Sequence, residues 1–299
     1  MMYVIGVDGG GTKTETVAYD LEGNKLTSIL TGFGNLVNGK DEALRNILDG
    51  IKQIFEKHGK DNVKGIYLGL AGSEVGFNAD IVYESVKKEF SVESIVMNDS
   101  ELALKALLRG EDGILAIAGT GSIAFGLNNG VQWKSGGWGH LLGDEGSAYK
   151  IAIEGLKHMI YENDNNMELG ALSRELLTAL EVEKVDDIIG FVYSSTKDEI
   201  AKLAQIVSKL AEKGDEKSLS IMVSEGELLG ETTRQVFSKL GFESCSVGLV
   251  GGVVRKSKIF RDAYESYLRE KVNIVSFIDD DVSPAKGAFY IYKKEVTLI

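Results

Sequence analysis

Four glycine-rich segments and one aspartate carry the residue types that could bind a phosphorylated ligand and act on it. The first segment, Val4–Thr14, is an apolar run that reaches Asp8 and continues as Gly-Gly-Gly-Thr-Lys-Thr. Glycines let the backbone approach a ligand and direct its N–H groups at one point, which suits phosphate. Asp8, at the end of the expected strand, is placed to hold a hydrated Mg²⁺ beside that phosphate. Taken alone, the segment is equally typical of a β-hairpin with a glycine-rich turn.

A second, shorter glycine loop repeats this pattern. An apolar run from Gly113 leads into Gly119-Thr-Gly-Ser122, and an apolar strand returns from it. Both loops begin the same series of strand, glycine turn, strand, turn and strand. We therefore favour a duplicated fold with a cleft between its halves over a coincidence of hairpins. Two such loops could together grip one polyphosphate.

Asp99 is the candidate general base. It follows the expected strand 94–98 and precedes an expected helix, and α/β sheets bind their ligands at the carboxyl ends of parallel strands. A carboxylate in that position can accept the proton of an attacking hydroxyl. Aspartate is also a favoured helix N-cap, and one residue could serve both purposes.

The glycine-acid block, residues 135–147, has the sequence Ser-Gly-Gly-Trp-Gly-His-Leu-Leu-Gly-Asp-Glu-Gly-Ser. Its glycines would allow close approach to a ligand, and Asp144 and Glu145 could accept hydrogen bonds from sugar hydroxyls. The two acids also precede an expected helix, whose N-terminus would stabilise them in any case. His140 is a weaker candidate base than Asp99, because a histidine in such a loop more often makes structural hydrogen bonds.

The last glycine pair, Gly251-Gly252, ends another expected strand and could let a flat ring such as adenine lie against the backbone. Two common nucleotide motifs are excluded. A P-loop requires lysine where Thr12 stands, and the dinucleotide fingerprint requires its third glycine one residue before Gly143.

Strands alternate with helices along the chain, which predicts an α/β fold with mostly parallel sheets. Apolar spacing predicts helices in the first part over residues 41–59, 80–90 and 101–109. After the glycine-acid block the expected helices cover 147–161, 168–180, 198–213 and 216–240. Glycines at 226 and 230 could bend the last of these. Helices over 256–269 and 284–293 follow.

Composition narrows the function class. The 299 residues are 43% hydrophobic, as in ordinary globular proteins, and the net charge of −12 argues against nucleic-acid binding. Cys245 is the single cysteine, so no internal disulfide or multi-cysteine metal site is expected, and a reducing cytoplasm is the natural compartment. No apolar run approaches the ~20 residues of a membrane span, and no signal peptide is expected before the first glycine motif.

Taken in order, these motifs resemble the N-acetylglucosamine kinase group of the sugar kinase/Hsp70/actin superfamily, within the wider BadF/BadG/BcrA/BcrD ATPase family. The resemblance spans residues 3 to about 290, and the glycine-acid block is its most specific part. It implies an α/β fold of two RNase H-like (actin-like ATPase) domains around a central cleft. The implied domains are 1–112 and 113–299, with a helical insertion at about 147–240 and a final helix, 284–295, that packs back onto the first domain.

The resemblance also implies roles for individual residues. Asp99 matches the catalytic base and a sugar contact, and Asp8 the metal-binding position. The implied ATP-binding residues are Gly10, Gly11, Thr12, Lys13, Thr120, Gly121, Gly251 and Gly252. The other implied sugar-binding residues are Asn35, Gly136, Gly137, Asp144 and Ala148. The loop at Asn35 departs from the family's pattern, because Gly34 stands where the N-acetylglucosamine kinase has threonine.

The activity implied by the resemblance is ATP- and Mg²⁺-dependent phosphorylation of the 6-hydroxyl of N-acetylglucosamine or N-acetylmuramic acid. It would serve cell-wall sugar salvage in a cytoplasmic homodimer, and glucosamine stays open as an alternative substrate. An ATPase activator of a radical dehydratase, known in the same wider family, would need cysteines for an iron–sulfur cluster. A non-catalytic sugar sensor is a third interpretation. The acidic net charge disfavours a sensor that binds DNA.

Overall fold

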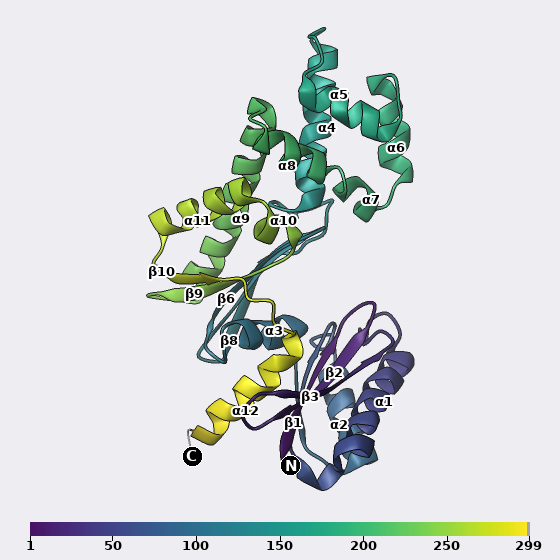
Figure 1. Cartoon of the computed structure of the whole chain (residues 1–299), viewed down its shortest axis with the longest axis vertical. Coiled ribbons are helices and arrows are strands. Elements are labelled where there is room, and N and C mark those ends of the chain that lie inside the picture. Colours follow the sequence, from purple (N-terminus) through teal and green to yellow (C-terminus); the bar gives the residue numbers. More distant parts are fainter. Residues whose placement is uncertain (298–299) are drawn as a thin grey trace. The chain divides into compact units, whose positions relative to one another are not determined.

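The computed structural model describes residues 1–297 and divides into two units, each built on a five-stranded sheet (Figure 1). The first unit is Met1–Gly113 together with the segment from Asp280 onward, and the second is Ile114–Asp279. The end of the chain therefore belongs with its beginning. None of the described helices combines the length and the apolar content needed to cross a bilayer.

The sheet of the first unit has the strand order β3-β2-β1-β4-β5. Its strands are β1 (Tyr3–Gly9), β2 (Thr14–Asp20), β3 (Lys25–Thr31), β4 (Val63–Leu70) and β5 (Ser94–Met97). β1 pairs antiparallel with β2 and parallel with β4, and β4 pairs parallel with β5. The carboxyl ends of β1, β4 and β5 consequently lie at one edge of the sheet.

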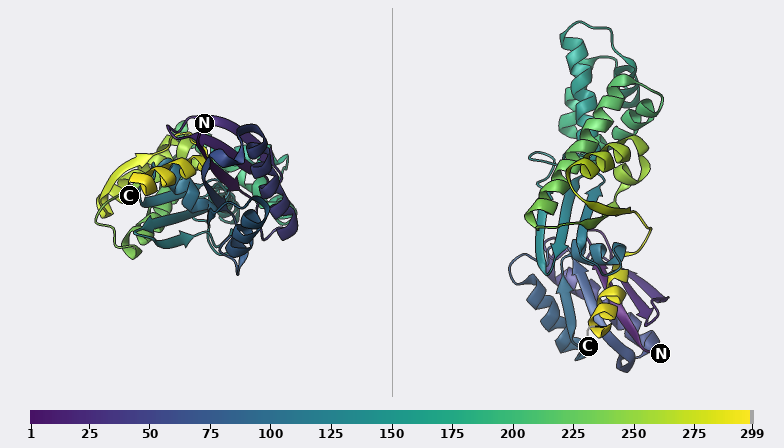
Figure 2. Two further views of the ribbon diagram at one scale, coloured as in Figure 1. Left: turned by 90° about the horizontal axis from the view of Figure 1, so that it is seen from below. Right: turned by 90° about the vertical axis from the view of Figure 1, so that its left-hand side faces the viewer.

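Helices cover both faces of this sheet. They are α1 (Lys40–His58), α2 (Asn78–Phe90), α3 (Asp99–Leu107) and α12 (Gly287–Thr297), with short 3₁₀ turns η1 (Lys60–Asn62) and η3 (Pro284–Lys286). The apolar stripe of α1 packs with Ile5 and Val7, whereas Phe289 of α12 packs with Val4 on the other face. The yellow helix α12 lies against the purple strands in both figures (Figures 1 and 2).

The second sheet repeats the plan of the first, with the order β10-β9-β6-β7-β8. Its strands are β6 (Gly113–Ala118), β7 (Ser122–Asn128), β8 (Val131–Gly136), β9 (Cys245–Val250) and β10 (Ile274–Ile278). In both sheets the earliest strand is central, the next two lie on one side and the last two on the other. The expected pair of RNase H-like α/β domains is thereby confirmed.

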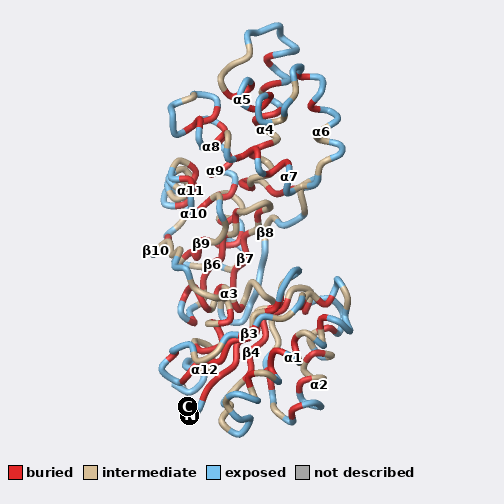
Figure 3. Tube along the Cα trace, turned by 45° about the vertical axis from the view of Figure 1, so that its right-hand side comes forward, coloured by how far each residue is buried: buried red, intermediate tan, exposed pale blue. Residues whose placement is uncertain are grey.

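The second unit carries most of the helices. They are α4 (Ala148–Asp164), α5 (Ala171–Leu180), η2 (Val185–Asp187), α6 (Ile188–Ser194), α7 (Lys197–Ala201), α8 (Ala204–Glu212), α9 (Glu216–Lys239), α10 (Gly252–Lys256) and α11 (Lys258–Lys271). Figure 3 shows red, buried backbone running through the strands and the inner turns of the helices. The core joins sheet residues such as Val247 to helix residues such as Leu229 and Tyr264.

The helix predictions for this unit need correction. α6 has no counterpart among the expected helices, and the single helix expected over 198–213 is two helices, α7 and α8. The helix expected over 256–269 is preceded by a separate one-turn helix, α10. α9 runs uninterrupted through Gly226 and Gly230. A Cβ at Gly226 would lie 2.6 Å from the carbonyl oxygen of Phe260, so this glycine lets α9 and α11 pack closely.

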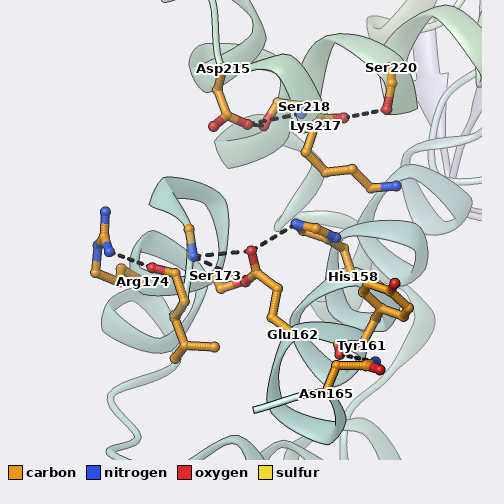
Figure 4. A network of polar contacts seen from close by, with 12 residues as sticks. His158, Tyr161, Glu162, Asn165, Ser173, Arg174, Asp215, Lys217, Ser218 and Ser220 are labelled. Carbon is orange, nitrogen blue, oxygen red and sulfur yellow. Dashed lines mark hydrogen bonds and ion pairs between the residues drawn. The ribbon is translucent and has the colours of Figure 1, made fainter. Parts of the chain in front are cut away.

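A polar network is structural in the helical part of the second unit, which comprises helices α4 to α9. The Glu162 carboxylate on α4 accepts hydrogen bonds from the Gly170 N–H at 3.1 Å and from the Ser173 hydroxyl at 2.5 Å, and His158 lies 3.1 Å away (Figure 4). Gly170 is the N-cap of α5, whose first N–H groups have no partner inside the helix. Glu162 therefore caps α5 from a neighbouring helix, and its bonding capacity is taken up by this task.

Candidate active site

The first glycine loop, residues 9–13, presents a row of unpaired backbone donors. Gly10 N–H donates to the Lys13 carbonyl at 3.0 Å, which closes the turn. The N–H groups of Gly11, Thr12 and Lys13 make no hydrogen bond to any described residue, and all three residues are exposed. Consecutive N–H groups that point into solvent form a site for an anion such as phosphate.

Asp8 ends the buried part of β1 just before this loop. The pKa of its carboxyl is raised to about 6, mainly by burial and also by the negative charges of Asp99 and Glu15, while Lys13 opposes the rise. The carboxylate thus lies in a negative, partly desolvated environment. The neighbouring negative charges that raise the pKa of Asp8 would also attract a cation bound at this carboxylate.

Asp99 lies at the same sheet edge as Asp8. Asp8 is paired with Gly69 of β4, Gly69 is paired with Met97 of β5, and Asp99 is the first residue of α3 just beyond. A Cβ at Gly69 would lie 2.4 Å from the Leu102 Cβ, so glycine is what allows α3 to approach β4. This close approach places the Asp99 carboxylate above the ends of the parallel strands.

The N-cap of α3 is Asn98, not Asp99 as the sequence suggested. The Asn98 side chain accepts the Ser100 N–H at 2.8 Å. Oδ1 of Asp99 also accepts this N–H at 2.8 Å, and the Ser100 hydroxyl at 3.3 Å. Burial nevertheless raises the pKa of Asp99 above its ordinary value, against these hydrogen bonds. Asn98 is therefore the N-cap, Asp99 shares the Ser100 N–H through Oδ1, and burial increases the affinity of the Asp99 carboxylate for a proton.

Asn35 lies beside the first glycine loop. Its backbone N–H donates to the Gly10 carbonyl at 3.1 Å, and its side-chain Oδ1 accepts the Val37 N–H at 2.9 Å. The side-chain oxygen is thus used in a local turn, which leaves the amide NH₂ group as the donor that could reach a ligand.

No group of three or more His, Cys, Asp or Glu side chains among residues 1–297 is arranged to hold a metal ion. A protein cage for a metal is therefore absent from the described chain. Mg²⁺ in nucleotide sites needs only one or two carboxylates, because phosphate and water oxygens complete its shell. Asp8, with Asp99 and Glu15 close enough to raise its pKa, fits that requirement.

In the second unit, the glycine-acid block is attached to the second glycine loop, residues 119–122. The carbonyl of Gly119 accepts the Ala148 N–H at 2.9 Å, and the Ser122 hydroxyl donates to the Glu145 carbonyl at 2.6 Å. The N–H groups of Thr120 and Gly121 have no hydrogen-bond partner in the described chain. The Gly119 carbonyl thus bonds to the start of α4, and two N–H groups of the loop are left for a ligand.

Asp144 occupies an unusual position in this block. Its φ is +70°, its side chain is 3% exposed, and its Oδ2 lies 2.6 Å from Nζ of Lys197. The sequence interpretation missed Lys197, which is 53 residues away and belongs to the helical part. The Thr196–Glu199 spacing predicts a helix start at this point, but nothing in the sequence indicates which carboxylate the lysine would meet.

Glu225 on α9 is the second residue that sequence reasoning missed. Its carboxylate accepts the Gly146 N–H at 2.6 Å, and it is 4% exposed. Burial raises the pKa of Glu225 to about 7, and the charges of Glu154 and Glu145 contribute. Glu225 therefore fixes the end of the glycine-acid block from inside the core.

Gly251 lies against the second glycine loop. Its φ is +105°, and a Cβ there would be 2.2 Å from the Ala118 carbonyl oxygen. Its neighbour Gly252 has no atom within 4 Å of the same position. The two glycines thus differ: the backbone conformation and close packing require glycine at position 251, whereas position 252 faces open space.

His140 packs edge-on against Tyr149, with ring centroids 4.9 Å apart, which fits a structural role better than a catalytic one.

The predicted site residues are divided between the two units. Those of the first unit are Asp8, Gly10, Gly11, Thr12, Lys13, Asn35 and Asp99. Those of the second are Thr120, Gly121, Gly136, Gly137, Asp144, Ala148, Gly251 and Gly252. Gly136 ends β8 and Gly137 follows it, with φ of +75° and +71°, and the Gly137 N–H donates to the Ser122 carbonyl at 3.0 Å.

Comparison with known proteins identifies one family and two similar kinases. The family model of the BadF/BadG/BcrA/BcrD ATPase family matches residues 5–291. The chain is 32% identical to the N-acetylmuramic acid/N-acetylglucosamine kinase of Clostridium acetobutylicum, with 99% of each chain covered. It is also 32% identical to the N-acetyl-D-glucosamine kinase of Dictyostelium discoideum, with 95% of each covered.

A solved structure shares the fold. The crystal structure of a candidate N-acetylglucosamine kinase from Chromobacterium violaceum superposes with a TM-score of 0.70 at 23% identity. The alignment covers 98% of this chain and 99% of that one. At this level of identity the likeness establishes the architecture alone.

Proposed function

The chain belongs to the BadF/BadG/BcrA/BcrD ATPase family, and from this membership we propose that it is an ATP-dependent amino-sugar kinase. The reaction is transfer of the γ-phosphoryl group of ATP to the 6-hydroxyl of an N-acetylhexosamine. The observation that carries the proposal is the Asp99 carboxylate, partly buried at the same strand ends as Asp8 and next to a loop of unpaired N–H groups. Kinase chemistry needs this combination of a proton acceptor and phosphate donors.

Asp99 is the proposed base. As the sugar O6 attacks the γ-phosphorus, the O6–P bond forms, the bond from phosphorus to the bridging oxygen breaks, and ADP leaves. The hydroxyl proton passes to the Asp99 carboxylate. The raised pKa of Asp99 makes it a stronger acceptor than an exposed aspartate, and that improves proton transfer.

The glycine loops are the proposed phosphate donors. The unpaired N–H groups of Gly11, Thr12 and Lys13 in one loop, and of Thr120 and Gly121 in the other, would stabilise charge on the transferring group. They are fixed in place by the backbone, so they do not have to reorganise during the reaction. Gly10 shapes the first loop, and Gly251 and Gly252 are proposed to contact adenosine.

Asp8 is the residue proposed to hold Mg²⁺, either directly or through water. The ion, when bound with ATP, would neutralise charge on the phosphates. The chain's own contribution is a partly buried carboxylate whose acidic neighbours raise its pKa and so favour a cation.

The sugar is proposed to contact Asn35, Asp99, Gly136, Gly137, Asp144 and Ala148. N-acetylglucosamine and N-acetylmuramic acid are the proposed acceptors, because a relative that matches over 99% of both chains carries both names. Glucosamine, which lacks the acetyl group, is the alternative that the experiment has to separate.

The proposal includes a cellular setting. We infer a cytoplasmic homodimer that works in the salvage of cell-wall sugars. Cys245 is the single cysteine and is buried, so the chain has no internal disulfide, which is consistent with a reducing compartment. A lone buried cysteine also offers no ligand set for an iron–sulfur cluster, so a dehydratase activator is not favoured.

The test is sugar-dependent release of ADP by the full-length protein, measured with a coupled assay. Each acceptor is assayed at several concentrations: N-acetylglucosamine, N-acetylmuramic acid and glucosamine. The matched control is 6-deoxy-N-acetylglucosamine, which has no 6-hydroxyl and should give no ADP above background. Release at the same rate without sugar, or with the 6-deoxy compound, would contradict the proposed reaction.

A further inference from the structure

The pair formed by Lys197 and Asp144 has properties beyond those of a surface ion pair. Nζ of Lys197 lies 2.6 Å from Oδ2 of Asp144, and the exposed fractions of the two side chains are 29% and 3%. A buried carboxylate that loses its cation is left uncompensated in a medium that solvates charge poorly. Lys197 therefore supplies the positive charge that compensates the buried Asp144 carboxylate.

The backbone of Asp144 has an uncommon conformation. Its φ of +70° lies in the left-handed region, which glycine adopts freely and asparagine and aspartate adopt only occasionally. Such a conformation persists only where the surroundings determine it. The surroundings here are the Lys197 ammonium on the side chain and the Ser147 N–H, which donates to the Asp144 carbonyl at 3.1 Å.

The pair lies against the second glycine loop. A Cβ at Gly121 would be 2.6 Å from Nζ of Lys197 and 3.0 Å from Oδ2 of Asp144. Glycine at this position therefore makes room for the ion pair. The lysine thus connects the helical part to both the phosphate loop and the glycine-acid block.

Lys197 is itself held firmly by its own helix. It is the first residue of α7, and a capping box fixes that helix start: the Glu199 N–H donates to the Thr196 hydroxyl, and the Thr196 N–H donates to Glu199. α7 packs on α4, the helix that begins at Ala148 directly after the glycine-acid block. The lysine stem consequently starts from a defined point.

We propose that Lys197 is a positioning residue for the sugar acceptor, acting through Asp144, an inference that rests on the proposed function. Lys197 holds Oδ2 and thereby fixes the carboxylate. Oδ1 accepts no hydrogen bond within the described chain and is the oxygen that meets a sugar hydroxyl. The helical part, through this one lysine, sets the affinity for the sugar and leaves the affinity for ATP unchanged.

The experiment compares Lys197→Met and Lys197→Arg with the wild type in the full chain. Lys202→Met, which removes an exposed lysine just beyond the same short helix, is the matched control. Steady-state constants for both substrates are measured, and sugar binding is titrated by calorimetry. Lys197→Met is expected to raise KM and Kd for N-acetylglucosamine by at least ~10-fold and to change KM for ATP by less than ~3-fold. Lys197→Arg should restore sugar binding, and Lys202→Met should match the wild type.

A double-variant cycle separates positioning from a general structural effect. In an Asp144→Asn background, Lys197→Met should add less than ~2-fold to the loss, because the lysine acts through that carboxylate. Should Lys197→Met fail to fold, Lys197→Gln is used with the same expectation.

A rise in KM for ATP in place of the sugar would overturn the inference and make Lys197 a phosphate ligand. Unchanged sugar affinity in an active enzyme would overturn it as well, and so would a loss that Arg does not restore. Absence of sugar-dependent turnover in the wild type would overturn the proposed function and, with it, this inference.

Discussion

Gly34 packs with its backbone directly on that of Gly9. A Cβ at Gly34 would lie 2.7 Å from the Gly9 Cα and 2.5 Å from Oγ1 of Thr14. The Gly34 N–H also donates to the Gly10 carbonyl at 2.9 Å. The first glycine loop and the turn that carries Asn35 are therefore one packed piece. Glycine at position 34, which departs from the family's pattern, is explained by this contact.

Gly34→Thr is expected to destabilise the protein by about 2–3 kcal/mol, because the added side chain has no space and the backbone must shift. Sugar binding should weaken in parallel, since Asn35 is the next residue. Thermal and urea unfolding measure the first effect, and calorimetric titration with N-acetylglucosamine the second. Gly10→Ala is the control, because its Cβ would meet only the Lys13 carbonyl oxygen, at 3.8 Å. Equal stability of Gly34→Thr and wild type would contradict the packing argument.

Gly251→Ala and Gly252→Ala form a matched pair in neighbouring positions. The first change should cost about 3 kcal/mol of stability or more, because φ is +105° and a Cβ would lie 2.2 Å from the Ala118 carbonyl oxygen. The second should leave stability unchanged, since its Cβ would enter open space. If adenosine lies there, Gly252→Ala raises KM for ATP and leaves KM for the sugar unchanged. A rise in both, or in neither, would place adenosine elsewhere.

Glu225→Gln tests the buried carboxyl through the pH dependence of stability. In the folded protein the pKa of Glu225 is about 7, whereas it is near 4.5 in an unfolded chain. The folded state therefore holds this proton more tightly, and the stabilisation is complete below pH 4.5 and is lost as the pH rises through 7.

The glutamine variant lacks this titration and can still accept the Gly146 N–H. Between pH 4.5 and 8 the wild type should lose roughly 3 kcal/mol relative to Glu225→Gln, measured by urea unfolding at the two pH values. A constant difference between the two proteins across this range would show that the carboxyl does not titrate as proposed.

The duplicated α/β units were within reach of the sequence, because a strand that ends in a glycine turn leaves a local signal, and the family resemblance implied that they are RNase H-like. The order of the strands in each sheet was not predicted, because it depends on pairing between distant segments. Asp8 and Asp99 were candidates because each lies near the end of an expected strand. The N-cap was misassigned because Asn98 and Asp99 are both good caps, and only the backbone decides between them. Packing among the helices of the second unit determines where α7 and α8 separate and where α6 forms.

Lys197 and Glu225 could not have been found from the sequence. Each meets its partner across a long stretch of chain, 53 residues from Lys197 to Asp144 and 79 from Glu225 to Gly146. Neither residue belongs to a motif with chemical meaning. Side chains that support a site from a distance come from tertiary structure, whereas the loops that contact a ligand carry their own sequence pattern.

Turnover by Asp99→Asn is the most direct test of the central claim, which is that this carboxylate accepts the proton of the attacking hydroxyl. The amide is nearly the same size and can still accept hydrogen bonds from Ser100, so ATP and sugar should bind with affinities within ~3-fold of wild type. The rate of ADP release at saturating substrates should fall by more than ~10²-fold. Asn98→Ala, which removes the N-cap of α3 and leaves Asp99 in place, is the control and should cost about 1 kcal/mol of stability with most of the turnover retained. Near-normal turnover by Asp99→Asn, with both ligands bound, would contradict the account.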